Sequence, residues 1–357
     1  MIRYAVVGAG WITQEAFLPA VPQTGNSRVT AIVSGNLKGA RRLAEFHQIE
    51  QVIDYRGFDD LLRSDSVDAV YIAVPNPMHA DFAVRAARAG KHVMVEKPIA
   101  TSIEQARTMI KAARGHGVML MTSYRLHNDA ATVNALTSLR SGKIGTPLFF
   151  SALFGFQSQI GNHRLKGEHW GGPLQDIGIY CINAARHVFE AEPVEVFAMS
   201  ARPTDDPRFE EVDASVAVTM RFPEGRLAEF FCSFGAYDVD AYRIVGTHGE
   251  LRVENGFRFE SGTRVVLDTR SNVEHVSFER YDQFAGQIHY FSDCIINGTR
   301  PEPDGEEGLA DLTVLLAIER SLQTGRPQKV RSSPRKRHPV SEMIRKIPTT
   351  NKRLLLS

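Results

Sequence analysis

The sequence has few cysteines and no long hydrophobic run. Only three cysteines occur in 357 residues, at Cys181, Cys232 and Cys294, and they form no CxxC pair and no cluster with histidine. This spacing excludes a disulfide framework and a zinc site built from neighbouring thiols. We expect three reduced thiols in or near the core, and no metal. No apolar run reaches the ~18 residues that a membrane span requires.

An excess of charge of either sign is also absent. The chain has 42 basic and 41 acidic residues, a net charge of +1, so electrostatics gives no reason to expect a membrane or nucleic acid as a partner. The first residues, MIRYAVVGAG, are typical of a strand. They lack the charged, apolar and small-residue regions of a signal peptide. We therefore expect a cytoplasmic protein.

Basic residues do gather in one place, the C-terminal tail over residues 331–357. Eight Lys or Arg residues there oppose the single acid Glu342. Such a segment can bind nucleic acid, but a solvated terminus or an arm over a neighbouring subunit is the favoured interpretation.

A chain of 357 residues is long for one hydrophobic core and predicts two domains. In residues 1–122, short apolar runs alternate with segments of helical periodicity, which is typical of βαβ units and a parallel sheet buried on both faces. The expected strands are Ile2–Val7, Val29–Val33, Ala69–Val74, His92–Val95 and Val118–Met121. The expected helices are Gln14–Val21, Lys38–Phe46, Phe58–Arg63, His79–Ala89 and Ile103–Arg114.

After residue 123 strands predominate, which predicts a second, α+β domain over residues 123–330 with an open, mostly antiparallel sheet. One helix interrupts the strands near 175–188, and two more follow near 283–296 and 306–324. We assign six aromatic residues to the open face: Phe149, Phe150, Phe154, Phe230, Phe231 and Phe234. An open face this apolar predicts contact with a second copy, so we expect a homodimer or homotetramer built through the sheet.

The first strand is followed by Gly8-Ala9-Gly10-Trp11-Ile12-Thr13. Two glycines at a strand-to-helix turn fit a dinucleotide loop: the first allows the tight turn and the second lets backbone approach the pyrophosphate at a helix N-terminus. The third glycine of that pattern is replaced by Thr13. Two glycines alone are a weak signal, but the position at the first turn of a βαβ unit makes it strong. We expect Gly8, Gly10, Trp11 and Ile12 to bind a dinucleotide.

The second strand ends in Ser34-Gly35-Asn36, where NAD-binding proteins place an acid for the ribose hydroxyl. No acid is present, and Lys38, Arg41 and Arg42 follow within the next turns. A hydroxyl with nearby cations suits a 2′-phosphate better than a free hydroxyl, which favours NADP over NAD. The competing interpretation is that these cations only decorate an exposed helix.

The fourth expected strand ends abruptly in Glu96-Lys97-Pro98. With this motif in place, the chain resembles the Gfo/Idh/MocA family of oxidoreductases. Four segments carry the resemblance in order: GAGWIT at 8–13, AVPNPMHADFA at 73–83, AGKHVMVEKP at 89–98 and GGPLQDIGIYCIN at 171–183. The branch with glucose–fructose oxidoreductase, dihydrodiol dehydrogenases and aldose dehydrogenases is most similar, because of the tyrosine in DIGIY at 176–180.

The resemblance implies a Rossmann domain followed by an open-faced α/β domain, and an NADP-dependent enzyme that acts on a sugar or cyclic polyol. It implies that Lys97, Tyr180 and Asp176 are catalytic. The residues expected on the nicotinamide side are Pro75, Asn76, His79 and Glu96. Arg125 and Arg164 are expected to join Lys97, Asp176 and Tyr180 in binding substrate. The chain departs from the sugar enzymes in loop 155–170 and at Gly172-Pro173.

The residues themselves allow this chemistry. Asp176 and Tyr180 are four apart and share one face of a helix. A phenol has an ordinary pKa of ~10, so a tyrosine that takes a hydroxyl proton near neutral pH needs a cation beside it. An ammonium ~4 Å away at an effective dielectric of ~20 supplies about 4 kcal/mol, which is enough. We therefore expect Tyr180 to carry the proton and Lys97 to assist; Lys97 as the base remains open.

Each of these residues also has an ordinary explanation. Taken alone, Tyr180 would be a core tyrosine, Asp176 a helix-turn carboxylate, His79 a helix cap and Lys97 a surface lysine. The two motifs at 89–98 and 171–183, in this order, favour the catalytic interpretation. A catalytically silent NAD(P)-binding sensor of the same fold is the alternative function.

Overall fold

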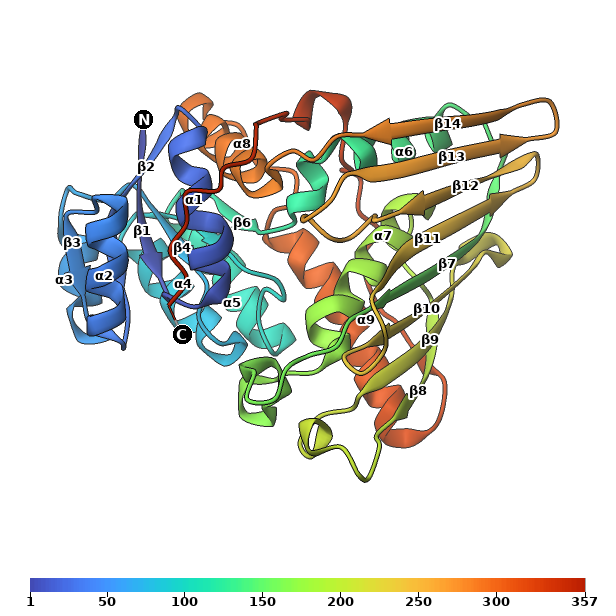
Figure 1. Cartoon of the computed structure of the whole chain (residues 1–357), viewed down its shortest axis with the longest axis horizontal. Coiled ribbons are helices and arrows are strands. Elements are labelled where there is room, and N and C mark those ends of the chain that lie inside the picture. The colour runs from blue at the N-terminus through green and yellow to red at the C-terminus, as the bar shows by residue number, and fades with distance from the viewer. Residues whose placement is uncertain (357) are drawn as a thin grey trace. The chain divides into compact units, whose positions relative to one another are not determined.

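The computed structural model describes residues 1–356, which form two compact units. The first, the Rossmann unit, contains Met1–Asp129, Tyr281–Leu309 and residues 343–356. The second, the sheet unit, contains Ala130–Arg280 and Ala310–Glu342. Figure 1 shows the first mainly in blue and teal and the second mainly in green and yellow. Helices and strands are both present, as the α/β prediction requires.

The Rossmann unit is built on a six-stranded parallel sheet in the order β3-β2-β1-β4-β5-β6. Its strands are β1 (Ile2–Val7), β2 (Ser27–Val33), β3 (Gln51–Ile53), β4 (Ala69–Ile72), β5 (His92–Val95) and β6 (Leu120–Thr122). Strands β4 and β5 are almost wholly buried, which explains their solidly apolar sequences. The order of the strands reverses between β1 and β4, where open α/β sheets bind ligands at their carboxyl edge.

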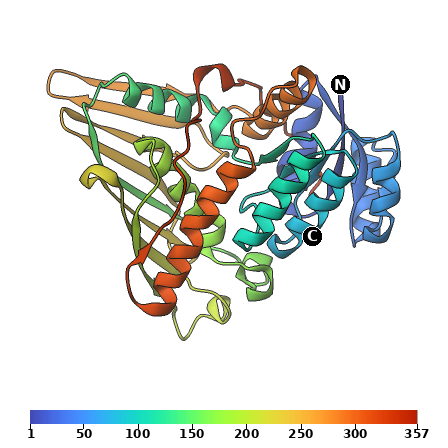
Figure 2. The same ribbon diagram turned by 180° about the vertical axis from the view of Figure 1, so that it is seen from behind.

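Helices cover both faces of this sheet. They are α1 (Leu18–Ala20), α2 (Leu37–His47), α3 (Phe58–Arg63), α4 (His79–Arg88), α5 (Ile103–Gly115) and α8 (Gln283–Asn297). Helices α4 and α5 pack side by side over β4, β5 and β6, as Figure 2 shows from behind. Helices α1 and α8 lie on the opposite face, which Figure 1 brings to the front.

Helix α8 belongs to the Rossmann unit although the sequence placed it in the range 123–330. Its Ser292 Oγ is 2.8 Å from the Tyr4 hydroxyl of β1, and Asn26 Nδ2 donates to the His289 carbonyl at 3.0 Å. These contacts join residues more than 260 positions apart. The Rossmann unit is therefore discontinuous in sequence, which a division into successive ranges does not express.

The sheet unit is built on a nine-stranded sheet in the order β14-β13-β12-β11-β7-β10-β9-β8-β15. All neighbouring strands are antiparallel except β7 and β10, which run parallel. The strands are β7 (Pro147–Gly155), β8 (Glu195–Ala201), β9 (Ser215–Arg221), β10 (Leu227–Ser233), β11 (Val239–Gly246), β12 (Gly249–Glu254), β13 (Thr263–Thr269), β14 (Val273–Phe278) and β15 (Gln328–Lys329). The mostly antiparallel sheet confirms the prediction for this region.

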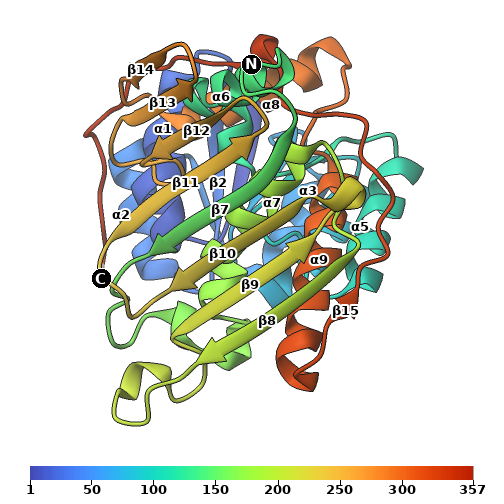
Figure 3. The ribbon, with the colours of Figure 1, turned by 90° about the vertical axis from the view of Figure 1, so that its right-hand side faces the viewer.

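One face of this sheet is covered by helices and the other is open, as Figure 3 shows. The helices are α6 (Ala130–Arg140), α7 (Ile179–Phe189) and the part of α9 (Gly305–Thr324) that lies in this unit.

The assignment of all six phenylalanines to the open face is wrong. Phe150, Phe154, Phe230 and Phe234 are buried, whereas Phe149 and Phe231 are 50% and 53% exposed. Successive strand residues point to opposite faces, so consecutive phenylalanines cannot share one face.

All three cysteines are buried and free, as expected. Within residues 1–356, no helix has both the length and the apolar character needed to cross a membrane.

Candidate active site

The dinucleotide loop lies at the carboxyl end of β1. Gly8 has a φ of +102°, and a Cβ at this position would lie 2.4 Å from the Ala73 carbonyl oxygen, so only glycine fits. A Cβ at Gly10 would meet no atom within 4 Å, which leaves open space beside the loop. Thr13, in place of the third glycine, donates from Oγ1 to the Gly8 carbonyl at 2.7 Å. The threonine therefore closes the turn by a hydrogen bond.

A π-helical turn over Thr13–Phe17 follows this loop and leads into α1. Such turns are frequent at functional sites. Trp11 is exposed and Ile12 is half-buried at the start of the helical segment. Its N-terminus offers backbone N–H groups to an anion, as the pyrophosphate of a dinucleotide requires.

The end of β2 forms a turn that caps α2. Asn36 N donates to Ser34 Oγ at 3.1 Å, and Asn36 Oδ1 accepts from Gly39 N at 3.0 Å. Gly35 lies against Tyr55, whose ring a Cβ would approach to 3.2 Å. Lys38 is exposed three and four residues before Arg41 and Arg42, which are also exposed. Residues at this spacing share one helix face, so three cations extend outward from this turn.

His79, at the start of α4, is completely buried. Its Nδ1 is 2.9 Å from the Pro98 carbonyl and its Nε2 is 3.0 Å from the Val74 carbonyl. Burial lowers the pKa of His79 to about 4, so the ring is neutral near pH 7. The imidazole thus links the chain segments that leave β4 and β5. Pro75 and Asn76, on the segment after β4, are both half-buried.

The strand β5 ends at Val95, and Glu96-Lys97-Pro98 follows with a cis bond before the proline. Tyr71, from β4, donates its hydroxyl to Glu96 Oε1 at 2.8 Å and stacks on Phe17 with ring centroids 3.7 Å apart. An aromatic pair therefore connects the helix after the dinucleotide loop with the turn that carries Lys97.

Glu96 lies among opposite charges. Burial raises the pKa of the Glu96 carboxyl, while the positive charges of Lys97 and Arg125 and the Tyr71 hydroxyl counteract the rise. Arg125 is buried, donates to Gln283 Oε1 and lies 5.8 Å from the Phe284 ring centroid. Helix α8 therefore anchors the arginine that the resemblance assigned to substrate.

In the sheet unit, Asp176 lies in a second π-helical turn, Leu174–Gly178, which precedes α7. Arg164 Nε is 3.0 Å from Asp176 Oδ2, and both side chains are mostly buried. Tyr180, on the first turn of α7, is half-buried, and its ring centroid is 6.0 Å from that of Phe154 and 6.5 Å from that of Phe257. The structure therefore brings the three polar residues predicted in this unit to one helix start and the loop beside it.

Two glycines make this arrangement possible. A Cβ at Gly171 would lie 2.3 Å from the Arg164 carbonyl oxygen, and Gly172, with a φ of +123°, donates from N to that oxygen at 2.9 Å. The backbone of the segment that carries Arg164 therefore contacts the start of the helix directly.

Sequence reasoning missed the buried ion network under α7. Arg186 donates from Nε and Nη2 to Glu192 at 2.6 and 2.9 Å, and from Nη1 to Asp311. Asn183 Nδ2 donates to the same aspartate at 2.9 Å. The sequence signal is a pair of polar residues, Asn183 and Arg186, three apart in a largely apolar helix. This network fixes α7, and with it Tyr180, to the adjacent helix α9.

The C-terminal segment makes contacts that the sequence did not indicate. Residues 343–356 belong to the Rossmann unit, with most of their side chains exposed or half-buried. The backbone N of Leu356 donates to Gln14 Oε1 at 2.6 Å, Arg353 pairs with Glu15, and Gln14 Nε2 donates to the Ala9 carbonyl at 2.7 Å. The segment therefore reaches the dinucleotide loop through one side chain.

The expected residues thus gather in two groups. The carboxyl edge of the Rossmann sheet carries the dinucleotide loop, the turn at Ser34, the segment after β4, and Lys97. The sheet unit carries Arg164, Asp176 and Tyr180. The meeting of Lys97 with Tyr180 stays a prediction.

Comparison with known proteins assigns both parts of the chain. The profile described as "Oxidoreductase family, NAD-binding Rossmann fold" of Gfo/Idh/MocA matches residues 2–124, and the profile of the Gfo/Idh/MocA C-terminal domain matches residues 133–252. A D-xylose 1-dehydrogenase [NADP(+)] from Haloarcula marismortui is 32% identical over 331 residues, which cover 90% of this chain and 91% of that protein.

Solved structures agree with this assignment. An aldose-aldose oxidoreductase from Caulobacter crescentus, in complex with glycerol, has a TM-score of 0.85 and 32% identity, with 92% of this chain and 99% of that chain covered. A 3-ketoreductase from Actinomadura kijaniata, in complex with NADP and TDP-benzene, has a TM-score of 0.82 and 29% identity, with 90% and 98% covered.

Proposed function

Because the chain belongs to the Gfo/Idh/MocA family of oxidoreductases, we propose that it transfers a hydride between NADP and the carbinol or carbonyl carbon of a sugar or cyclic polyol. The observation that carries the proposal is the joint placement of the dinucleotide loop and the Glu96-Lys97 turn at the carboxyl edge of one parallel sheet. Relatives named as sugar dehydrogenases and reductases support the substrate class.

The cofactor is NADP rather than NAD. The end of β2 offers the Ser34 hydroxyl and no acid, and Lys38, Arg41 and Arg42 extend from the same helix face. A 2′-phosphate finds hydrogen-bond donors and positive charge there, without a carboxylate to repel it. The xylose dehydrogenase named for NADP(+) and the 3-ketoreductase solved with NADP support the same assignment.

We assign proton transfer and substrate orientation to side chains of the protein. The nicotinamide, when bound, donates or accepts the hydride. Tyr180 takes the proton of the substrate hydroxyl during oxidation and returns it during reduction, and the ammonium of Lys97 stabilises the phenolate and polarises the oxygen. Asp176 and Arg164, already paired, orient the sugar hydroxyls.

Two buried residues position this machinery. His79 joins the segments after β4 and β5 through the Val74 and Pro98 carbonyls. Tyr71 holds Glu96, the neighbour of Lys97. We assign both residues a positioning role, because their polar atoms form hydrogen bonds within the protein.

The proposed function is tested with the purified protein, NADP and a panel of aldoses and polyols, and with NADPH and the corresponding carbonyl compounds. We expect at least one sugar to change the absorbance of the nicotinamide, at a higher rate with NADP than with NAD. No change with any compound in either direction would refute the proposal.

The open face of the sheet supports a homodimer or homotetramer. Its exposed apolar residues are Phe149, Leu153, Met199, Leu227 and Phe231, a patch of the kind that marks an interface. We expect light scattering to give a multiple of 39.7 kDa, and Phe231→Glu to lower it. Phe46→Glu, at an exposed site of the Rossmann unit, is the control. A monomeric wild type, or an unchanged mass for Phe231→Glu, would contradict this assembly.

A further inference from the structure

The loop between β7 and α7, residues 156–172, carries Arg164 and has little regular structure of its own. Its start extends the pairing with β10, since Phe156 N donates to the Ser233 carbonyl at 3.0 Å and Ser158 N to the Phe234 carbonyl at 2.9 Å. At its end, the carbonyl oxygen of Arg164 lies against Gly171 and accepts a hydrogen bond from Gly172 N. Between these ends the loop has hydrogen bonds of its own, such as those from Arg164 N to Asn162 Oδ1 at 3.0 Å and from Lys166 N to the His163 carbonyl at 3.1 Å, and it also contacts other parts of the sheet unit.

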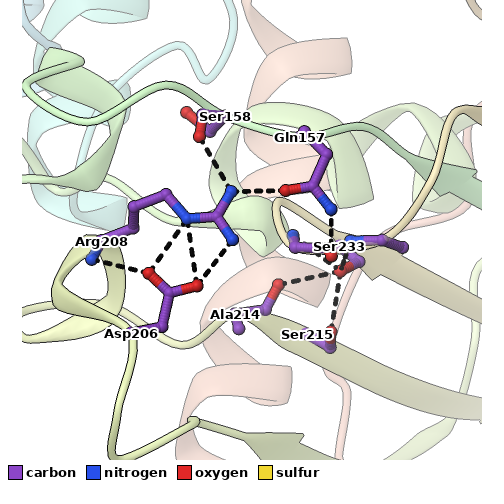
Figure 4. Close-up of polar contacts among 9 residues, drawn as sticks. Gln157, Ser158, Asp206, Arg208, Ala214, Ser215 and Ser233 are labelled. Carbon is purple, nitrogen blue, oxygen red and sulfur yellow. Dashed lines mark hydrogen bonds and ion pairs between the residues drawn. The ribbon is translucent and has the colours of Figure 1, made fainter.

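Contacts from outside the loop come mainly from residues 202–214, which connect β8 with β9. Arg208 donates from Nη1 to Gln157 Oε1 at 2.5 Å and to the Ser158 carbonyl at 3.1 Å, while Asp206 holds the guanidinium through Nη2 at 2.6 Å and Nε at 3.0 Å. Figure 4 shows the arginine between Asp206 on one side and Gln157 and Ser158 on the other. Gln157 in turn donates from Nε2 to the Gly235 carbonyl at 2.6 Å.

A second contact lies further along both loops. Glu211 accepts from Lys166 Nζ at 2.6 Å and from Gly167 N at 2.9 Å. Each contact thus includes a backbone group of loop 156–172: the Ser158 carbonyl in the first and the Gly167 N–H in the second. A bond to backbone fixes the course of a loop irrespective of the side chain at that position.

Although Arg208 lies at the surface, its side chain is held in place by a carboxylate and by an aromatic ring. Its side chain is 19% exposed and that of Asp206 is 24% exposed. The guanidinium lies 4.9 Å from the ring centroid of Phe209, which is 1% exposed. A guanidinium that is held by a carboxylate and stacked on a buried ring loses little further freedom when it binds the loop.

From these contacts we infer that Arg208 and Glu211 are positioning residues for the sugar substrate. The inference rests on the proposed function. By fixing loop 156–172 at Ser158 and Gly167 they set the position of Arg164, which lies between these two points and pairs with Asp176. The β8–β9 connection, which need not touch substrate, thereby determines how well the polyhydroxylated substrate fits.

The test uses the double variant Arg208→Met, Glu211→Gln, which removes the guanidinium and the carboxylate charge and keeps an unbranched side chain at both positions. We expect KM for the sugar to rise by about tenfold, the change that corresponds to losing one hydrogen bond to a charged group. We expect kcat to stay within about twofold, because the groups that react are unchanged. The affinity for NADPH, measured by nicotinamide fluorescence, should not change.

The matched control is Arg221→Met. Arg221 pairs with Glu195 at the opposite end of the same two strands, β8 and β9, and is exposed. It makes no contact with loop 156–172 among those that the structure gives for residues 1–356. This variant should retain the KM of the wild type. Glu211→Gln alone, at an exposed pair, provides the test if the double variant does not fold, with a smaller rise in KM expected.

Hydrogen exchange gives a readout that does not depend on activity. We expect the amides of residues 156–170 to exchange faster in the double variant than in the wild type or in Arg221→Met. An unchanged KM in a folded double variant would overturn the inference and leave the proposed function intact. A wild type that turns over no sugar would refute the proposed function itself, so the two failures are distinguishable.

Discussion

Tyr180→Phe should lower kcat by about 10²- to 10⁴-fold, the range that general acid–base catalysis contributes. The phenylalanine keeps the ring that packs near Phe154 and Phe257, so the fold of α7 should be preserved. It removes the only atom of Tyr180 that can carry a proton. The affinity for NADP should stay nearly constant, because the dinucleotide loop belongs to the Rossmann unit and Tyr180 to the sheet unit.

Lys97→Met should produce a loss of similar size, since the methionine fills the space of the lysine stem and lacks its charge. The measurement is steady-state kcat with the best sugar of the panel, together with cofactor binding by fluorescence. Tyr237→Phe is the control, because Tyr237 is 88% exposed in the sheet unit. If both Tyr180→Phe and Lys97→Met retain the turnover of the wild type, the proton is carried elsewhere and the proposed roles are wrong.

The second large effect is expected on stability. Arg186→Met should lower the free energy of unfolding by about 3–5 kcal/mol, because it removes the guanidinium that pairs with two buried carboxylates. Arg186, Glu192 and Asp311 are all nearly inaccessible to solvent. The measurement is urea-induced unfolding followed by circular dichroism.

Two further variants make this prediction specific. Arg264→Met removes one partner of an exposed pair with Glu254 and should change stability by less than about 1 kcal/mol. Adding Glu192→Gln and Asp311→Asn to Arg186→Met should recover part of the loss, since no uncompensated charge then remains. A single variant as stable as the wild type would show that the carboxylates have other compensation.

Local patterns in the sequence predicted the strands with continuous apolar runs and the helices with clear periodicity. Apolar runs separated by helical periodicity gave the parallel sheet, and Phe58–Arg63 was predicted with the bounds of α3. The strand β3 was missed because its three residues, Gln51–Ile53, are only half-buried and form no apolar run. The position of α8 was also not predicted, because its amphipathic pattern does not indicate which sheet the helix covers.

The same limit applies to the site. The glycines after β1 predicted a tight turn, and the positive φ of Gly8 confirms it. Hydrogen bonds between residues that are far apart in the sequence produce no periodic pattern. The pairing of Arg186 with Asp311, 125 positions apart, could therefore not be predicted. The contacts of Arg208 with Gln157 and Ser158 belong to the same class, because these residues lie in two connections that are far apart in the sequence.

The position of Leu356 affects how this protein should be handled. Its amide bonds to Gln14, whose own amide bonds to Ala9 of the dinucleotide loop. A purification tag or fluorescent fusion joined directly after this segment would strain or break the hydrogen bond between Leu356 and Gln14 that supports the loop. Titrations of nucleotide with such a fusion would report a weakened site, so an affinity measured that way should be repeated after the tag has been cleaved.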